Sequence, residues 1–317
     1  MKNVKKIFLA FVMSTLLVVV AACGNNDDEK GAADGEKLSG EVRIDGSSTV
    51  APIMEAVAEE YSAEQPDVKA SVGISGTGGG MEKFTKGETD LSNASRPMKD
   101  EEKEAAEEND VEFLELNVAY DGISIVVNKD NDFVDQLTMD ELRKIFLEEG
   151  GVKKWSEVRD GWPEEEIKIY SPGTDSGTYD YFDEVILEEK EMKKDAQRSE
   201  DDNVLVTGVA GDKNAIGFFG FAYYEENKDK LKVVPIDGGE GKAVEPTKET
   251  INSGEYSPLS RPLFTYVSVK SLERAEVKDF IEFMNENAGD LAEEVGYVKM
   301  PDEEYEKNIK AIEDAVK

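Results

Sequence analysis

Stretches in which apolar and polar residues alternate are followed along this chain by stretches in which apolar residues recur at helical spacing. Val42 and Ile44 alternate with polar neighbours, which predicts a short strand. A helix is predicted over residues 50–61, where apolar residues fall on one helical face. These residues are Val50, Ile53, Met54, Val57, Ala58 and Tyr61. The same succession returns at residues 68–74 and 81–86. The pattern predicts an α/β fold with mainly parallel sheets.

The rest of the chain continues this alternation. Thr49 is the predicted N-cap of the helix over residues 50–61. Thr138 and Glu141 form a capping-box pair in a helix predicted over residues 137–146. Further strands are predicted over residues 123–127, 167–170, 215–219, 231–236 and 263–269, and further helices over residues 179–186 and 276–285.

Three short loops between predicted strands and helices consist mainly of glycine and hydroxyl residues. Their sequences are GSSTVAP at residues 46–52, GISGTGGG at residues 73–80 and GTDSGT at residues 173–178. Glycine lets the backbone approach a ligand closely, and serine and threonine supply hydroxyl donors. The first N–H groups of the following helix are unpaired and lie at the positive end of its dipole. The loops therefore predict a binding site for one small oxyanion.

The amino-terminal segment has the pattern of a secretion signal. Lysines near the start precede an apolar stretch over residues 7–22, which predicts a signal peptide over residues 1–22. Small residues then precede Cys23, the one cysteine of the chain, in a pattern that resembles a bacterial lipobox. Cys23 would become the lipid-modified, palmitate-bearing first residue; an ordinary cleavage site with an incidental cysteine is the alternative. Residues 23–37 are polar and predict a disordered tether.

The charge of the chain limits its ligands. It has 71 acidic and 37 basic side chains and a formal net charge of −34. Nucleic acid and anionic membrane surfaces are therefore not expected as ligands. An anion site here has to rely on donors at contact distance, because salt screens the long-range repulsion. So large an acidic excess also suggests a saline or alkaline habitat.

The composition excludes several kinds of active site. The chain has no histidine, so Ser-His-Asp triads, Cys-His pairs and His-containing zinc sites are absent. It has no P-loop or dinucleotide fingerprint, and residues 130–135 match an EF-hand loop only in part. Hydrolysis by two carboxylates stays open, although no pair stands out. We expect no enzyme activity, no cofactor and no bound metal.

Five motifs in order resemble the phosphate-binding lipoproteins of bacterial Pst-type ABC transporters. Besides the lipobox, they are residues 46–52, 75–80, 93–97, 175–178 and 215–218. The resemblance runs from about residue 38 to the C-terminus. It implies a type II periplasmic-binding-protein-like fold, in which two α/β lobes are joined by two strands and the ligand lies in the cleft between them. Lobe 1 would comprise residues 38–120 and 259–317, and lobe 2 residues 121–258, with crossings near residues 117–122 and 256–263.

The resemblance also implies function and partners. The chain would be a receptor, lipid-anchored on the extracytoplasmic face of the cell membrane, that delivers inorganic phosphate to the permease and ATPase subunits of an ABC transporter. We expect it to act as a monomer. A receptor for another tetrahedral oxyanion, such as sulfate, is the leading alternative. An anchored phosphate-ester hydrolase is a further alternative, and a structural adhesin would not need convergent loops.

Site residues follow from the motifs one by one. In the first loop the resemblance implies the Thr49 hydroxyl and the Val50 N–H as ligands, with Ser48 adjacent. In the second loop Ser75 is preferred and Thr77 is second, because the match is ambiguous by one residue. The third loop implies Ser176, Gly177 and Thr178.

Two positions depart from the family pattern. Arg96 stands where many members have an aspartate, and Pro172 stands where they have an arginine. Arg96 is therefore the predicted cation of the site, and Asp121 is the predicted acceptor for a phosphate proton, with Asp175 as second choice.

Structural roles remain open for several of these residues. Thr49 and Ser176 are also expected as plain N-caps, and Arg96 as the partner of a surface carboxylate. Asp175 is also explained by compensation of a helix dipole. Arg261 is interpreted as a structural ion-pair partner rather than a ligand.

Overall fold

The computed structural model of the protein describes residues 37–174, 176–199 and 201–316. The predicted signal peptide, Cys23, nearly all of the predicted tether and Asp175 lie outside the described residues. Among the helices of the described part, none has the length and apolar composition needed to cross a membrane.

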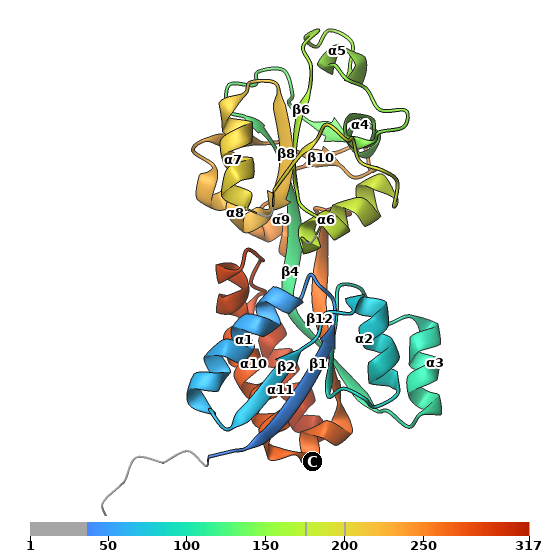
Figure 1. Cartoon of the computed structure of the whole chain (residues 1–317), viewed down its shortest axis with the longest axis vertical. Coiled ribbons are helices and arrows are strands. Elements are labelled where there is room, and N and C mark those ends of the chain that lie inside the picture. The colour runs from blue at the N-terminus through green and yellow to red at the C-terminus, as the bar shows by residue number, and fades with distance from the viewer. Residues whose placement is uncertain (1–36, 175, 200, 317) are drawn as a thin grey trace, which may run out of the picture. The chain divides into compact units, whose positions relative to one another are not determined.

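One group of strands and helices forms lobe 1, the lower part of Figure 1. Its strands lie in the order β2, β1, β3, β12, β4, with β1 parallel to β2 and β3, and β12 antiparallel to β3 and β4. The strands are β1 (Gly40–Gly46), β2 (Val68–Val72), β3 (Leu91–Ala94), β4 (Phe113–Asn128) and β12 (Ser260–Ser268). The helices are α1 (Ala51–Glu64), α2 (Gly76–Thr85), α3 (Asp100–Glu108), η2 (Val269–Glu273), α10 (Ala275–Glu294) and α11 (Asp302–Ala315).

Lobe 2 is built on the continuation of β4. The strand order there is β4, β8, β6, β7, with β9 also paired to β4, and a small sheet has the order β11, β10, β5. The strands are β5 (Leu137–Thr138), β6 (Lys168–Pro172), β7 (Gln197–Ser199), β8 (Ala215–Gly220), β9 (Leu231–Val233), β10 (Ile236–Asp237) and β11 (Ala243–Val244). The helices are α4 (Met139–Phe146), α5 (Trp155–Val158), α6 (Gly177–Phe182), the π-helical turn η1 (Asp183–Leu187), α7 (Asp202–Gly211), α8 (Phe221–Asn227) and α9 (Lys248–Asn252).

Strands β4 and β12 connect the lobes (Figure 1). β4 pairs with β12 up to Gly122, and from Ile123 onward it pairs with β8. The predicted two-lobed α/β fold with two connecting strands is therefore confirmed. The residue limits predicted for the lobes stay a prediction, although the change of partner falls close to the limit at residues 120 and 121.

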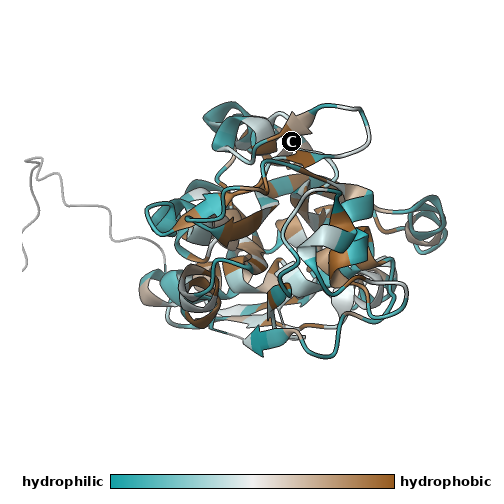
Figure 2. Ribbon diagram, turned by 90° about the horizontal axis from the view of Figure 1, so that it is seen from above, coloured by the Kyte–Doolittle hydropathy of each residue, from teal (hydrophilic) through white to brown (hydrophobic). Residues whose placement is uncertain are grey.

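Each lobe has its own hydrophobic core, and each core fixes one of the glycine loops. In lobe 1, Ile53, Met54 and Val57 on the predicted face of α1 are fully buried. In lobe 2, Phe182 of α6 stacks on Phe218 of β8 with ring centroids 3.7 Å apart. Figure 2 shows the resulting distribution, with hydrophobic residues gathered in the interior and hydrophilic residues outside. The starts of α1 and α6, which follow the first and third loops, are thereby held in place.

Two local predictions on these loops need correction. The N-cap of α1 is Val50, with no side-chain capping bond, so Thr49 is not the cap. Helix α2 begins at Gly76 rather than at residue 81, because the glycines of the second loop already form its first turns. By contrast, the N-cap role of Ser176 and the capping box of Thr138 and Glu141 are confirmed.

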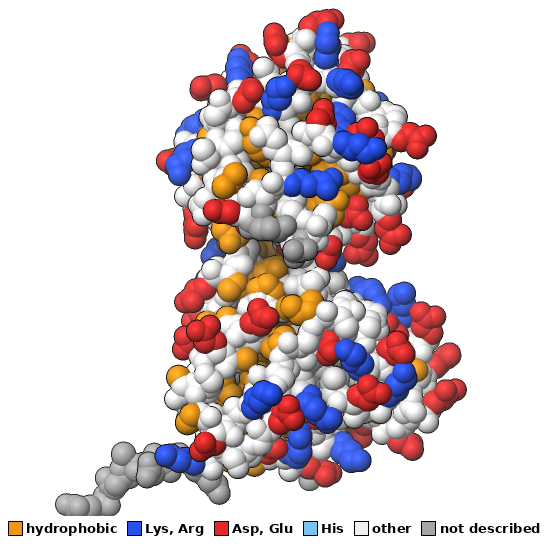
Figure 3. Space-filling model, viewed as in Figure 1, with side chains coloured by type: hydrophobic (Ala, Val, Ile, Leu, Met, Phe, Trp, Pro, Cys, Tyr) orange, Lys and Arg blue, Asp and Glu red, His pale blue; other side chains and the backbone are white. Residues whose placement is uncertain are grey.

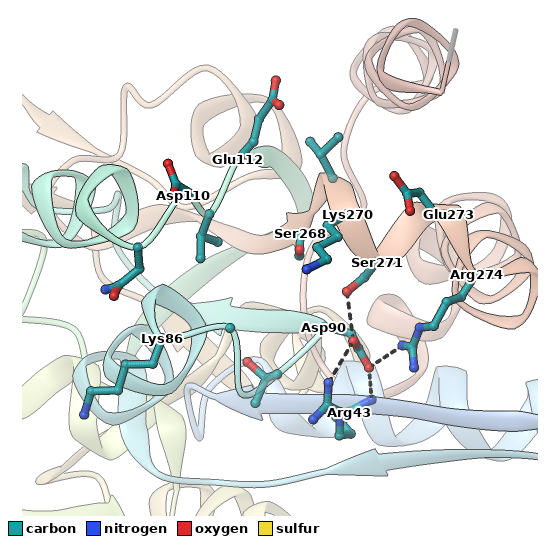
Figure 4. A pocket seen from close by; sticks show the side chains of 15 residues that line it. Arg43, Lys86, Asp90, Asp110, Glu112, Ser268, Lys270, Ser271, Glu273 and Arg274 are labelled. Carbon is teal, nitrogen blue, oxygen red and sulfur yellow. Dashed lines mark hydrogen bonds and ion pairs between the residues drawn. The ribbon is translucent and has the colours of Figure 1, made fainter.

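A polar pocket in lobe 1 lies apart from the three loops (Figure 4). Asp90 is buried at its base and accepts hydrogen bonds from the Arg43 backbone and side chain and from the Ser271 hydroxyl. Arg274 Nη2 lies 2.7 Å from the same carboxylate. Burial pushes the pKa of Asp90 up, but these donors and the Arg274 charge outweigh burial and leave the pKa below its usual value. Both arginines of this pocket are thus paired with the single carboxylate of Asp90.

Candidate anion-binding site

The first loop joins β1 to α1 and presents its hydroxyl groups toward other elements. Ser48 Oγ donates a hydrogen bond of 3.0 Å to Asp180 Oδ2 in the first turn of α6. Thr49 is buried, and its Oγ1 accepts a hydrogen bond of 3.3 Å from Arg261 Nη2 of β12. Because Thr49 does not cap α1, its hydroxyl is directed to a tertiary contact instead.

The second loop is held by a buried carboxylate. Asp45 Oδ1 accepts hydrogen bonds from Ser75 Oγ at 2.6 Å and from Ser75 N at 3.1 Å, and Lys83 pairs with Oδ2. Burial pushes the pKa of Asp45 up, but the bonds from Lys83 and Ser75 keep it below its usual value. The Ser75 hydroxyl proton is therefore committed to Asp45. Thr77 Oγ1 accepts a hydrogen bond from Ser95 N at 3.2 Å.

The third loop leads into α6 and touches the first loop. Ser176 Oγ caps the helix by accepting hydrogen bonds from the N–H groups of Thr178 and Tyr179 at 3.2 and 3.4 Å. A Cβ atom on Gly177 would lie 2.6 Å from the Thr49 Cα. Two of the three loops are thus in direct backbone contact.

Asp121 and Arg261 lie directly opposite each other on the two connecting strands. Both are largely buried, and Arg261 Nε is 3.5 Å from Asp121 Oδ2, longer than an ordinary hydrogen bond. Neither of these two atoms has a hydrogen-bond partner among the described residues. Burial raises the pKa of Asp121, and the Arg261 charge opposes this shift only in part. Asp121 is therefore an acceptor with unused capacity beside the loops.

Arg96 is placed differently. Its guanidinium donates to both carboxylate oxygens of Glu102, at 2.8 and 2.9 Å, and to the Pro97 carbonyl oxygen. The hydrogen bond with Glu102 is the main reason that the pKa of Arg96 is raised. The contacts that the structure describes for this guanidinium are thus with its own neighbourhood and not with Thr49 or Gly177.

The structure brings together Ser48, Thr49, Gly177 and Asp121, and adds Arg261, which the sequence interpretation placed in a structural role. Ser75 and Thr77 lie at the start of the adjoining helix α2, which packs closely on the first loop: a Cβ on Gly80 would lie 2.5 Å from the Gly46 Cα. The sequence predicted two connecting strands near these residues, but it carries no register that would place Arg261 opposite Asp121.

The surface around this site is uneven in charge. On the face drawn in Figure 3, charged side chains cover both lobes and are sparse where the lobes meet. Among the described residues no group of three acidic, histidine or cysteine side chains is arranged to hold a metal ion. The arrangement of hydroxyl groups, helix starts and one guanidinium is suited to binding an anion.

Comparison with known proteins gives consistent matches. A family model described as a PBP superfamily domain matches residues 31–287. The phosphate-binding protein PstS of Staphylococcus haemolyticus is 47% identical over 86% of this chain and 85% of its own length. The crystal structure of a possible phosphate binding protein from Planctomyces limnophilus is 46% identical, with a TM-score of 0.85, over 89% of this chain and 100% of that one. An ABC-type phosphate transport receptor from Vibrio cholerae is 26% identical, with a TM-score of 0.63, over 82% of this chain and 100% of that one.

Proposed function

Because the chain belongs to the PBP superfamily, we propose that it is an extracytoplasmic receptor that binds inorganic phosphate and delivers it to an ABC permease for uptake. The PstS relative is a phosphate-binding protein and the Vibrio cholerae relative is an ABC-type phosphate transport receptor, and both support this proposal. The observation that carries it is the meeting of Thr49, Gly177, Asp121 and Arg261 where β4 and β12 connect the lobes. In this role the protein is a binding protein and not an enzyme.

The proposed site keeps the donors predicted from the three loops. Phosphate oxygens would be bound by hydroxyl groups and by the N–H groups of Val50 and Gly177, because the N–H groups of Thr178 and Tyr179 already donate to Ser176 Oγ. The hydroxyl ligands are Ser48, Thr49, Ser75 or Thr77, Ser176 and Thr178. Asp121 would accept the phosphate proton, with Asp175 as second choice, and Arg96 remains the predicted cation. The Ser75 hydroxyl proton is bonded to Asp45, whereas Thr77 Oγ1 lies 3.1 Å from Ser95 Oγ with either hydroxyl as the donor, so Thr77 can turn its proton to phosphate more easily.

With the proposed division into lobes, bound phosphate would contact both lobes at once. Residues 38–120 and 259–317 would form one lobe and residues 121–258 the other, so that Thr49 and Gly177 belong to different lobes. A ligand that contacts both lobes favours the closed arrangement, because its binding free energy is larger there.

Titration with two anions tests the proposed function. Phosphate at one hundred times its Kd is expected to stabilise the protein against unfolding by about 2.7 kcal/mol, and sulfate at the same concentration by much less. Calorimetry and thermal melting at constant ionic strength measure both effects. Equal responses to both anions would contradict a phosphate receptor. Release of phosphate from a phosphate ester, abolished by EDTA, would instead support a hydrolase.

The membrane anchor is a separate part of the proposal. We expect Cys23→Ser to release the protein from the membrane fraction without changing its phosphate affinity, because none of the proposed ligand residues lies near Cys23 in the sequence. Fractionation of cells that express either form, with detection of the lipid by mass spectrometry, measures this. A Cys23→Ser protein that is processed normally and still remains membrane-bound would overturn the lipid anchor.

A further inference from the structure

Arg261 touches elements from both lobes at the point where they are connected. Its Nη2 donates to Thr49 Oγ1 of the first loop, and its Nη1 lies 3.3 Å from Glu184 Oε2 of the turn η1. The guanidinium carbon lies 3.6 Å from the ring centroid of Tyr181 in α6. Stacking on an aromatic face fixes the plane of a guanidinium and leaves its edge free to donate.

One N–H donor on the edge of the Arg261 guanidinium has no hydrogen-bond acceptor among the described residues. Nε has no hydrogen-bond partner among the described residues, and Asp121 lies 3.5 Å away. The Arg261 side chain is only 12% exposed, so water replaces the missing partners poorly. The guanidinium beside Thr49 is therefore buried and held in place, and its hydrogen-bonding capacity is only partly filled.

Arg96 lacks this spare capacity. The Nη1 and Nη2 atoms of Arg96 both donate charge-assisted hydrogen bonds to the carboxylate of Glu102, and the Glu102 side chain is only 15% exposed. Such bidentate pairs are among the stronger side-chain interactions. Arg96 would have to break this pair before it could bind phosphate, whereas Arg261 would not have to leave Asp121.

Glu184 is the weaker partner of Arg261. The Glu184 side chain is 63% exposed, and its single contact with Nη1 is 3.3 Å long. Ion pairs with an exposed partner contribute little, because water solvates the carboxylate nearly as well. Glu184 belongs to a π-helical turn, and such turns recur at functional sites.

We propose that Arg261 supplies the positive charge that holds phosphate, and that Glu184 occupies this guanidinium until phosphate replaces it. The inference rests on the proposed function, assigns the cation of the site to Arg261 in place of Arg96, and adds an internal competitor. Phosphate would take the Nη1 position that Glu184 leaves, while Asp121 stays beside Nε. Glu184 thereby sets the affinity without contacting the ligand.

Calorimetric titration of matched variants with inorganic phosphate tests the proposal. Arg261→Lys keeps the charge but loses the planar fork, and we expect it to weaken phosphate binding at least tenfold. Glu184→Gln removes the competitor, and we expect it to tighten binding about threefold. Glu189→Gln is the matched control, because it removes an equal charge from an exposed position just after the same turn. In the Arg261→Lys background, Glu184→Gln is expected to give no such gain.

Three results would overturn the inference. One is equal phosphate affinity in Glu184→Gln and Glu189→Gln, which would mean that Glu184 affects binding only through the net charge of the protein. Another is a loss of binding in Arg96→Lys with none in Arg261→Lys, which would make Arg96 the cation. A wild-type protein that binds neither phosphate nor sulfate contradicts both this inference and the proposed function. If the wild type binds only sulfate, the proposed function fails, and the same variants titrated with sulfate still decide the role of Arg261.

Discussion

Replacing Gly177 with alanine is expected to weaken phosphate binding by about thirty- to one hundredfold, while the ligand-free protein stays as stable as the wild type. The added Cβ would lie 2.6 Å from the Thr49 Cα, 3.0 Å from its Oγ1 and 3.1 Å from its Cβ. A backbone atom cannot rotate away, so the two loops have to separate. Overpacking of this kind costs roughly 1–3 kcal/mol, and each 1.4 kcal/mol is a tenfold change in Kd.

The ligand-free protein can avoid this clash by opening. Gly177 is the first residue of α6, where alanine is a better helix former than glycine, so the helix itself is not weakened. Gly211→Ala is the matched control, because Gly211 ends α7 in the same lobe and an added Cβ there meets no atom within 4 Å. Calorimetry gives the Kd of both variants, and thermal melting without phosphate gives their stability. Wild-type affinity in Gly177→Ala would show that the contact with Thr49 is not part of the phosphate-bound form.

The fold was predictable where local pattern and tertiary packing agree. The apolar face of α1 was identified because a buried helix face needs apolar residues at helical spacing, and Ile53, Met54 and Val57 are indeed buried. The start of α2 was missed for the opposite reason. Its first turns are glycines, which carry no apolar period and have low helix propensity, and they are helical because they pack on the first loop.

The candidate site was only partly predictable. Ser176 was identified as a cap because its partners follow it directly in the sequence. The surroundings of Arg261 come instead from Thr49, Asp121, Tyr181 and Glu184, which only the folded chain brings together. Thr49 was assigned as a cap by the same local reasoning, and the contact with Arg261 explains why its hydroxyl points elsewhere. Contacts between distant segments leave no periodic signal in a single sequence.

The chain carries a large negative charge, so whether one of its cations can bind an anion depends on how strongly that cation is already paired with a carboxylate. The chain has a formal net charge of −34, and basic side chains accordingly have acidic partners, as Arg96 has Glu102 and Arg43 has Asp90. A cation is then useful to a ligand only if its own carboxylate partner is weakly held. Arg261 meets this condition through Glu184, and the exposed carboxylate can move into water as phosphate enters.

Asp121→Asn is expected to reduce the preference for phosphate over sulfate at least tenfold, which corresponds to about 1.4 kcal/mol. Near neutral pH phosphate keeps at least one O–H group, whereas sulfate has none. An ionised Asp121 can only accept a hydrogen bond, so it binds the phosphate proton and repels sulfate. Its Oδ2 is buried without a hydrogen-bond partner among the described residues, so this capacity is unused without ligand.

Asparagine keeps the shape of Asp121 but adds two N–H donors, so sulfate affinity should rise while phosphate affinity falls modestly. Asp195→Asn is the control for the loss of one negative charge, because exposed Asp195 lies just before β7 in lobe 2 and outside the three loops. Asp175→Asn tests the second choice of acceptor. Calorimetric titration of all three variants with both anions measures the ratio of the two affinities. If neither Asp121→Asn nor Asp175→Asn lowers the ratio of phosphate to sulfate affinity more than Asp195→Asn does, neither carboxylate accepts the phosphate proton. Selectivity then has to come from backbone acceptors or from the size of the cleft.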